Sequence, residues 1–280
     1  MRQVVYESEN LSLIKVPGAR EDVVFVTFEP FIPGEREPVR DGFGEAFFAK
    51  RGITAYHFIS ESNAWYQYPE MPELLARVRA DLAPGVRVVA YGHSMGGYAA
   101  IHFANLLGAE TVLAFSPQAS IELPWETRWE MAGVRKLWDE RPPDPNVRVY
   151  TVYDPLSLDD RHIRYIGARA AIEPVRVHFC DHDSVVYAHE AGLLEGMLLD
   201  VAAGRLDVPD LEYRLWSARH DTPIYRKYRA RKSTSTLRRF RYTCLERVIE
   251  WRLRRSLARA PQPAAAGNEK PAGWRVKTSS

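Results

Sequence analysis

Cysteine is scarce in this chain, and its scarcity excludes two classes of protein. Cys180 and Cys244 are the only two cysteines in 280 residues, and they are too distant in sequence to form a disulfide framework. No Cys-x-x-Cys pair is present, which excludes the zinc sites built on such pairs. Free cysteines favour a reducing compartment, so we expect a cytoplasmic protein.

Long hydrophobic runs are also missing. No stretch approaches the roughly 18 apolar residues that a membrane-spanning helix needs. The first residues, MRQVVYESENLSLIKV, lack the basic segment followed by an apolar one that marks a secretory signal. No motif for a nucleotide, a flavin or a metal is evident, so we expect no cofactor.

What the chain does contain is typical of a globular protein: 46% hydrophobic, 11% aromatic and 26% charged residues. The net charge of +2 hides a strong asymmetry. Residues 205–280 hold 19 Lys and Arg against 7 Asp and Glu, a net of +12, whereas residues 1–204 carry a net of −10. An acidic body with a basic C-terminal extension makes contact with an anionic surface a hypothesis worth testing.

Short apolar runs alternate with segments of helical spacing through most of the first 204 residues. We expect strands at residues 4–7, 11–16, 23–28, 53–59, 86–91, 111–115, 147–153 and 175–180. We expect helices at residues 43–51, 72–82, 98–107, 129–138, 157–171 and 190–203. This alternation predicts an α/β fold with a mostly parallel sheet and helices on both faces.

One motif carries chemistry. Gly92-His93-Ser94-Met95-Gly96 fits G-x-S-x-G and lies between an expected strand and an expected helix, the context that this motif requires. The sharp turn strains the serine, the glycines leave room for it, and the helix N-terminus offers N–H groups where negative charge develops. The motif resembles the nucleophile elbow of the α/β-hydrolase family, and the resemblance covers about residues 20–203.

The resemblance implies a serine hydrolase with nucleophile, acid and histidine in that order along the chain, each just after a strand. Ser94, Asp154 and His182 occupy such positions. His182 would accept the Ser94 proton and pass it to the leaving group, while Asp154 would orient the imidazole and stabilise its charged form. An acyl-enzyme on Ser94 would then be resolved by water, with an ester as substrate, or a thioester or amide.

Other residues near these positions have simpler interpretations. Asp159 and Asp160 follow the same strand but fall at an expected helix start, where capping and dipole compensation account for them. His178 and Cys180 alternate with His182 along one strand, and His178 is expected in the core. A metal site there lacks further ligands, so we expect no metal.

The oxyanion hole needs two N–H donors. The resemblance assigns the first to the backbone of Met95, directly after the nucleophile, and the second to the loop after an earlier strand. That loop follows residues 23–28 and begins Glu29-Pro30, and Pro30 has no N–H. The second donor is therefore predicted at Phe28 or Glu29.

Two polar segments follow strands at the edge where ligands bind. Asn63, Trp65 and Tyr66 suit stacking and hydrogen bonding to a sugar or polar acyl group, although these aromatics could equally pack beneath their loop. Gln118 could line the site or form a turn. The segments SMGGYAA, AFSPQ and N-x-W-Y-Q are similar to segments of bacterial α/β-hydrolase-like proteins associated with surface polysaccharides, which sets no substrate.

The character of the chain changes at residue 205. Segments 209–231 and 237–259 are basic and helical, and the second forms an amphipathic helix. Residues 261–280, rich in Pro, Ala, Gly and Ser, are predicted to be disordered. We therefore expect a catalytic domain over residues 1–204, a basic helical extension over 205–260 and a disordered tail over 261–280.

Three functions remain open at this point. The first is a serine hydrolase acting on a small-molecule or glycan-linked acyl substrate. The second is an acyltransferase to a sugar or other hydroxyl, and the third is a non-enzymatic module that binds an anionic surface or glycan. For the extension we favour packing on the acidic body or an oligomer contact over lipid or polyanion binding, and a nucleic-acid partner is disfavoured because no binding motif accompanies the charge.

Overall fold

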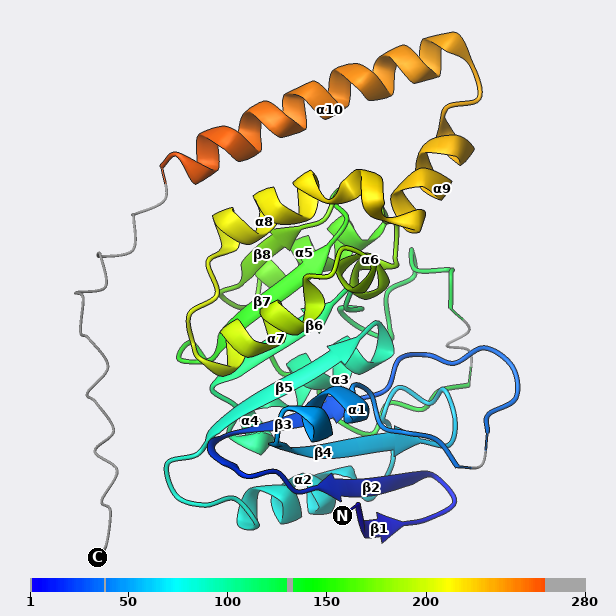
Figure 1. The fold of residues 1–280 in the computed structure, drawn as a ribbon. Coiled ribbons are helices and arrows are strands. Elements are labelled where there is room, and N and C mark those ends of the chain that lie inside the picture. The colour runs from blue at the N-terminus through cyan, green and yellow to red at the C-terminus, as the bar shows by residue number, and fades with distance from the viewer. Residues whose placement is uncertain (1, 38, 130–132, 260–280) are drawn as a thin grey trace, which may run out of the picture.

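The computed structural model describes residues 2–37, 39–129 and 133–259, and its centre is an eight-stranded sheet (Figure 1). The strands are β1 (Gln3–Glu7), β2 (Leu11–Val16), β3 (Arg20–Phe28), β4 (Ile53–Ser60), β5 (Arg87–His93), β6 (Thr111–Phe115), β7 (Arg148–Tyr153) and β8 (Glu173–Arg176). Their order is β1-β2-β4-β3-β5-β6-β7-β8. β2 pairs antiparallel with both of its neighbours, and every pair from β4 to β8 is parallel. The predicted mostly parallel sheet is confirmed.

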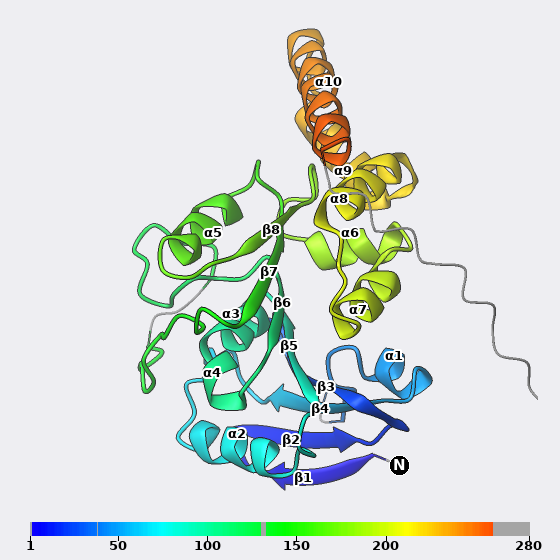
Figure 2. The same ribbon diagram turned by 90° about the vertical axis from the view of Figure 1, so that its left-hand side faces the viewer.

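Helices cover both faces of this sheet (Figure 2). One face carries α2 (Met71–Ala80), α3 (Met95–His102), α4 (Ala104–Leu107) and α5 (Asp159–Gly167). The other carries α1 (Glu45–Lys50), α6 (Ser184–Glu190), α7 (Leu194–Ala202) and α8 (Val208–Ser217). Side chains of β3 alternate between the two cores: Val24 and Val26 pack on the first face, and Val23 and Phe25 on the second. Burial on both faces explains why this strand is largely apolar from Val23 to Phe28.

The basic extension is helical, as predicted, and it packs on the body. It continues from α8 through a 3-10 turn (Arg219–Asp221) and α9 (Pro223–Lys232) into the long α10 (Thr236–Leu257). Its side chains Trp216, Tyr225 and Ile249 belong to the same buried cluster as Val152 of β7. Removing residues 205–259 would therefore expose the part of this cluster that α8, α9 and α10 cover. The predicted tail over 261–280 lies outside the described residues.

Two expected elements differ from the prediction. The strand expected over 175–180 ends at Arg176, because Phe179 (φ 69°) and Asp181 (φ 56°) turn the chain away from the sheet. The helix expected over 129–138 is absent from its described residues, 129 and 133–138. There the Gln67 side-chain oxygen accepts the N–H groups of Leu137 and Trp138, at 2.8 and 3.1 Å, in place of helical carbonyls.

Two expected helices are interrupted. The one expected over 98–107 divides at Phe103 into α3 and α4. The one expected over 190–203 corresponds to α7, because only its first residue, Glu190, is helical before the turn at Gly192 (φ 68°), as the end of α6. None of the helices in the described part of the chain combines the length and apolar character that a membrane crossing needs.

Candidate active site

Ser94 occupies a strained turn between β5 and α3. Its backbone has φ 57° and ψ −117°, and its N–H donates to the Phe115 carbonyl at 2.9 Å. The flanking positions must be glycine because a larger side chain would clash. A Cβ on Gly92 would lie 2.3 Å from the Gly96 backbone, and one on Gly96 would lie 2.1 Å from the Phe28 carbonyl oxygen. The sequence G-x-S-x-G therefore folds into the sharp turn that presents a serine side chain at a helix N-terminus.

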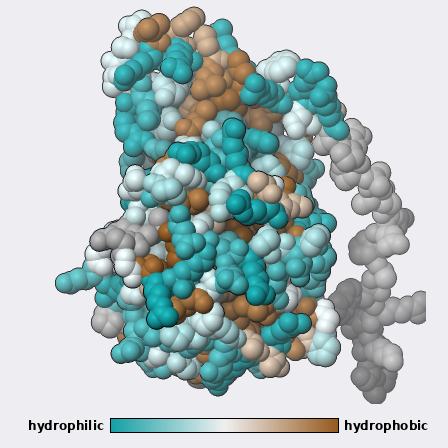
Figure 3. All heavy atoms as spheres, turned by 180° about the vertical axis from the view of Figure 1, so that it is seen from behind, coloured by the Kyte–Doolittle hydropathy of each residue, from teal (hydrophilic) through white to brown (hydrophobic). Residues whose placement is uncertain are grey.

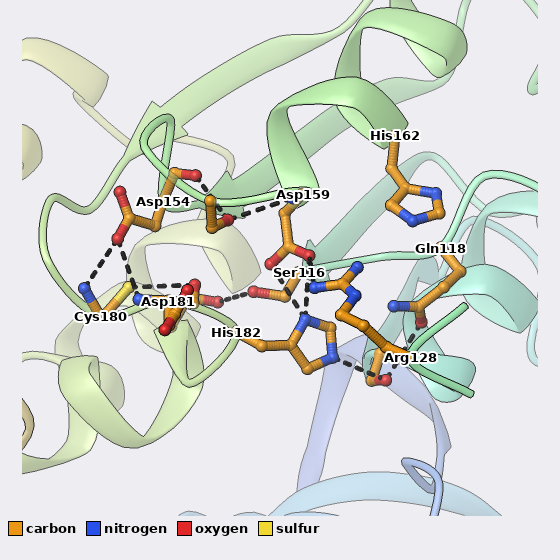
Figure 4. Close-up of polar contacts among 12 residues, drawn as sticks. Ser116, Gln118, Arg128, Asp154, Asp159, His162, Cys180, Asp181 and His182 are labelled. Carbon is orange, nitrogen blue, oxygen red and sulfur yellow. Dashed lines mark hydrogen bonds and ion pairs between the residues drawn. The ribbon is translucent and has the colours of Figure 1, made fainter. Parts of the chain in front are cut away.

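A chain of hydrogen bonds begins at this serine and continues through His182 to Asp159, the two members labelled in Figure 4. Ser94 Oγ lies 2.9 Å from His182 Nε2, and His182 Nδ1 lies 3.0 Å from both carboxylate oxygens of Asp159. Ser94 is 2% exposed, Asp159 is fully buried, and the His182 side chain is 17% exposed. The arrangement can pass a proton from the hydroxyl to the imidazole while the carboxylate orients the ring.

The prediction that Asp154 orients His182 is wrong, and Asp159 takes that place. Asp154 points instead to the turn that carries the histidine (Figure 4). Its carboxylate accepts the backbone N–H groups of Leu156, Cys180 and Asp181, each at 2.9 Å. Because those three bonds occupy the carboxylate, Asp154 shapes the approach to His182 rather than contacting its ring.

The two buried aspartates have opposite pKa shifts. Burial raises the pKa of Asp154 to about 7, against the lowering effect of its backbone N–H partners. Burial would also raise the pKa of Asp159, but the hydrogen bond from His182 and the charge of Arg128 outweigh it and hold that pKa below its ordinary value. Asp159 is therefore the carboxyl group kept ionised beside the histidine.

Arg128 and the residues behind it form a polar network that the sequence analysis did not identify. Arg128 donates to Asp159 at 2.8 Å and pairs with Glu126 at 2.6 Å. Glu126 lies 2.6 Å from Nε2 of the buried His162, whose Nδ1 accepts the Ala119 N–H at 3.0 Å. Because Nδ1 is an acceptor, His162 carries its proton on Nε2 and donates it to Glu126. The network fixes the loop after β6 to the start of α5.

Gln118, on that loop, lies beside the serine as a site-lining residue should. Its amide oxygen is 3.1 Å from Ser94 Oγ, and its amide nitrogen is buried without a hydrogen-bond partner among the described residues. The single hydroxyl proton of Ser94 can go either to this oxygen or to His182. Turning the amide over would offer its N–H to Ser94 and leave the hydroxyl proton for His182.

Aromatic rings border the histidine. The Trp129 ring lies 5.0 Å from the His182 ring, and Phe31 lies 5.4 Å from Trp129. On another side, His93 Nε2 donates to the His182 carbonyl at 3.0 Å, and burial lowers the pKa of His93 to about 4. These neighbours leave Ser94 little access to solvent.

Two of the predicted substrate-binding residues are in the core. Trp65 and Tyr66 are fully buried; Trp65 packs edge-on against Tyr98, and the Tyr66 hydroxyl donates to the Glu29 carbonyl at 3.1 Å. The prediction that these rings contact substrate is wrong, because both rings face inward and pack under their loop.

Asn63 joins two loops. Its side-chain oxygen accepts the Ile32 N–H at 3.0 Å, and its side-chain nitrogen donates to the Ile32 carbonyl at 2.7 Å. It also borders an open hollow of about 610 Å³ that Phe31 and Gln67 help to line. Its predicted contact with substrate stays a prediction.

The predicted oxyanion donors lie near the serine. Met95 is the first residue of α3, so its N–H has no partner within the helix. Phe28 ends β3 directly against Gly96. The Glu29 carboxylate is engaged elsewhere, by Arg40 at 3.0 Å and by the Ser60 N–H at 2.9 Å. The choice of second backbone donor stays a prediction.

A metal site is not formed by the alternating residues of the expected last strand. His178 packs edge-on against Trp216, whereas His182 contacts Ser94 and Asp159. Within residues 2–37, 39–129 and 133–259, no group of three or more His, Cys, Asp or Glu side chains could hold a metal ion.

No protein-family model matches the chain, and no curated protein matches its sequence. Among solved structures, a capsule O-acetyltransferase of Neisseria meningitidis serogroup A is similar with a TM-score of 0.50 and 11% identity, over 71% of this chain and 93% of that one. Alpha/beta hydrolase domain-containing protein 10 from mouse is similar with a TM-score of 0.48 and 15% identity, over 73% and 99%. A thermophilic esterase from Thermogutta terrifontis has a TM-score of 0.43 and 18% identity, over 73% and 90%.

At these identities the likeness concerns the fold alone. It agrees with the architecture described above: a mostly parallel sheet with β2 reversed, helices on both faces, and a serine at the sharp turn after β5. The sheet order, the reversed β2 and the serine turn after β5 are themselves the features of an α/β-hydrolase fold.

Proposed function

We propose that the chain is a serine hydrolase that cleaves an ester through an acyl-enzyme formed on Ser94. One observation carries the proposal: the continuous hydrogen-bonded path from Ser94 Oγ through His182 to Asp159. This is the constellation of a nucleophile, its base and an orienting acid, and it is recognised by geometry rather than by sequence position.

The groups would act as follows. As Ser94 Oγ bonds to the acyl carbon, its proton moves to His182 Nε2, and His182 then gives that proton to the departing alcohol. Asp159 accepts the Nδ1–H throughout and stays ionised, supported by Arg128 at 2.8 Å. Water attacks the acyl-enzyme, returns a proton through His182 to Ser94 Oγ and releases the acid.

Three groups would stabilise the oxyanion of the tetrahedral intermediate. The Met95 N–H stands at the N-terminus of α3, where the helix dipole favours negative charge. Gln118 is the polar side chain nearest to Ser94 apart from His182, and its buried amide nitrogen has no other partner among the described residues. Phe28 or Glu29 would add a backbone donor, as the family pattern predicts.

The burial of Ser94 favours small acyl groups. With 2% of its surface exposed and Trp129 beside His182, the serine has little room for a bulky acid. The remainder of the substrate would lie in the open hollow lined by Phe31, Asn63 and Gln67, whose polar edges suit a hydroxylated alcohol. Acyl transfer to a sugar hydroxyl would use the same acyl-enzyme, with that hydroxyl in place of water.

Covalent labelling tests the proposal. The folded protein is treated with a small fluorophosphonate, and the intact mass is measured for the wild type, Ser94→Ala, and Ser217→Ala as an exposed-serine control on α8. We expect one adduct on the wild type and the control and none on Ser94→Ala. An unlabelled wild type, or labelling that survives Ser94→Ala, would contradict the proposal.

Product analysis then separates hydrolysis from transfer. The protein is supplied with a small acetyl ester with and without a mixture of sugars, and acetate and acetylated sugar are quantified. Acetate as the main product in both samples supports a hydrolase. Acetylated sugar as the main product would make the chain an acyltransferase, still dependent on Ser94.

A further inference from the structure

Helix α10 has two apolar faces, and only one of them packs on the body. The inner face places Ile249 and Leu253 in the buried cluster beneath the helix, with Leu245 and Tyr242 partly buried beside them. These contacts hold α10 along α8, across the top of the molecule in Figure 1. The helix is therefore an integral part of the fold.

The outer face of α10 is apolar and exposed. Leu237 is 78% exposed, Phe240 67%, Val248 44% and Trp251 58%. With 3.6 residues per turn, these four side chains fall within about 80° of arc on the side away from the inner face. Figure 3 shows hydrophobic surface along this end of the molecule. We call these four residues the α10 stripe. Within the described residues, nothing covers it.

Arginines border the α10 stripe on both sides. Arg247 lies on one side in the helical projection, and Arg241 and Arg252 lie on the other, all of them exposed. Arg255, also exposed, projects within the arc of the stripe one turn beyond Trp251. The two acidic residues of the helix are already paired: Glu246 with Arg229 and Glu250 with Arg254, each at 2.6 Å. The outer face thus combines an apolar centre with cationic edges, and its positive charge is not neutralised locally.

A hollow lined by arginines lies at the C-terminal end of the α10 stripe. Arg255 lies over the Trp251 ring at 5.2 Å. Beside this pair, Arg252, Arg255 and Arg259 line an open hollow of about 470 Å³. An indole next to convergent guanidinium groups suits the boundary between acyl chains and phosphate headgroups, where tryptophan is enriched and arginine reaches toward the phosphates.

We propose that the α10 stripe and its flanking arginines bind the surface of a membrane that contains anionic lipid, with the axis of α10 parallel to the bilayer. Large apolar side chains on one face and arginines at its edges are what an interfacial helix needs. A second copy of this chain fits less well, because pairing two stripes would bring the arginine rows together. A nucleic acid would leave the apolar centre of the stripe unused.

The binding test uses the full chain and sedimentation with vesicles. One set of vesicles is phosphatidylcholine alone, and the other contains about one part in four of phosphatidylglycerol. We expect co-sedimentation with the anionic vesicles, weaker co-sedimentation with the neutral ones, and a large loss of binding when salt is raised from about 0.1 M to about 1 M. Equal binding to both vesicles, or no binding to the anionic ones, would overturn the proposal.

Two sets of substitutions distinguish the contribution of the apolar side chains from that of the arginines. Phe240→Ser with Trp251→Ser removes exposed apolar area and should weaken vesicle binding at least about tenfold without lowering the melting temperature. Arg241→Gln, Arg247→Gln and Arg252→Gln together should weaken it about 100-fold on anionic vesicles. The control Leu106→Ser changes an apolar residue of α4 that is 47% exposed, and it should bind like the wild type.

Two results would assign the surface to another partner and overturn the proposal. The first is binding to heparin or RNA that survives Phe240→Ser with Trp251→Ser, in a protein that ignores vesicles. The second is a dimer in light scattering that becomes a monomer in the same variant, again without vesicle binding. Neither readout depends on Ser94, so this proposal can fail while the proposed function stands.

Discussion

The end of β7 and the start of α5 each bury an aspartate, and the two sites use a carboxyl group in different ways. Asp154 is surrounded by backbone N–H groups of the turn that carries His182. Asp159 is surrounded by side chains that carry or exchange charge, His182 and Arg128. Both carboxyl groups are fully buried, so burial alone does not distinguish them.

The difference lies in what each neighbour can do during a reaction. A backbone N–H is a fixed donor that neither gains nor loses a proton, so Asp154 can only hold the shape of a turn. An imidazole changes its charge, so a carboxylate at its Nδ1 can stabilise the charged form. Position directly after a strand is therefore a weaker guide to the catalytic acid than the nature of the groups around it.

The largest effect should follow from replacing Asp159. Asp159→Asn should lower kcat/KM on a small ester by about 10³–10⁴, because the charge that stabilises the imidazolium is lost. Asp154→Asn is the matched control and should stay within about tenfold of the wild type, since its amide oxygen still accepts N–H groups. The measurement is steady-state kinetics on both variants with their melting temperatures, and a larger loss in Asp154→Asn would reverse the assignment.

Removing the Asp154 side chain should cost stability instead. Asp154→Ala leaves three N–H groups of the turn without their acceptor, and we expect the free energy of unfolding to fall by about 2–4 kcal/mol. Urea denaturation compared with Asp154→Asn measures it. An unchanged midpoint for Asp154→Ala would mean that the turn does not depend on this carboxylate.

The pH dependence of stability should distinguish the two carboxyl groups by sign. The pKa of Asp154 is raised to about 7 in the folded protein, so between pH 5 and pH 7 the folded chain keeps a proton that the unfolded chain releases. Asp154 should therefore lower the stability by about 1–2 kcal/mol over that interval as pH rises. Unfolding of the wild type and Asp154→Asn at several pH values tests this, and identical slopes would contradict it.

Replacing Arg128 should have the smallest effect, a shift in the pH at which the protein unfolds in acid. It lowers the pKa of Asp159 and of Glu126, and a lowered carboxyl pKa contributes stability that is lost as pH falls through it. Arg128→Met should raise both pKa values and move the acid-unfolding midpoint upward by less than about one pH unit. Arg164→Met, which breaks only an exposed pair with Asp160, is the control and should leave the midpoint in place.

The sequence was sufficient to predict the sheet and the elbow, because both depend on local patterns. The buried part of β3 from Val23 onward is largely apolar, and only glycine fits at positions 92 and 96, so close to neighbouring backbone. The identity of the acid depends on a turn: the chain after Asp154 folds back so that Asp159, read as a helix start, meets His182. A signal was present, since Asp159 lies six residues after the end of β7, close to the same edge of the sheet.

Other predictions failed because a residue type indicates what a side chain can bind but not which way that side chain points. Trp65 and Tyr66 have the side chains of a sugar-binding loop, but their backbone at φ 56° and 57° turns both rings into the core. Arg128 and Glu126 lie in the long connection between β6 and β7. In that connection the spacing of residues 129–138 predicted a helix that is absent from the described residues of that segment. Their pairing with Asp159 depends on long-range packing that no local pattern encodes.

The burial of Ser94 has a kinetic consequence. A nucleophile with 2% of its surface exposed is reached through a narrow opening, and Trp129 lies beside its base, His182, so the size of a reagent should limit how often it reaches Ser94. Labelling rates would then be similar for probes narrower than the opening, and these rates report the reactivity of the serine itself. For wider probes the labelling rate would drop sharply. The molecule would select substrates at its entrance before any bond is broken.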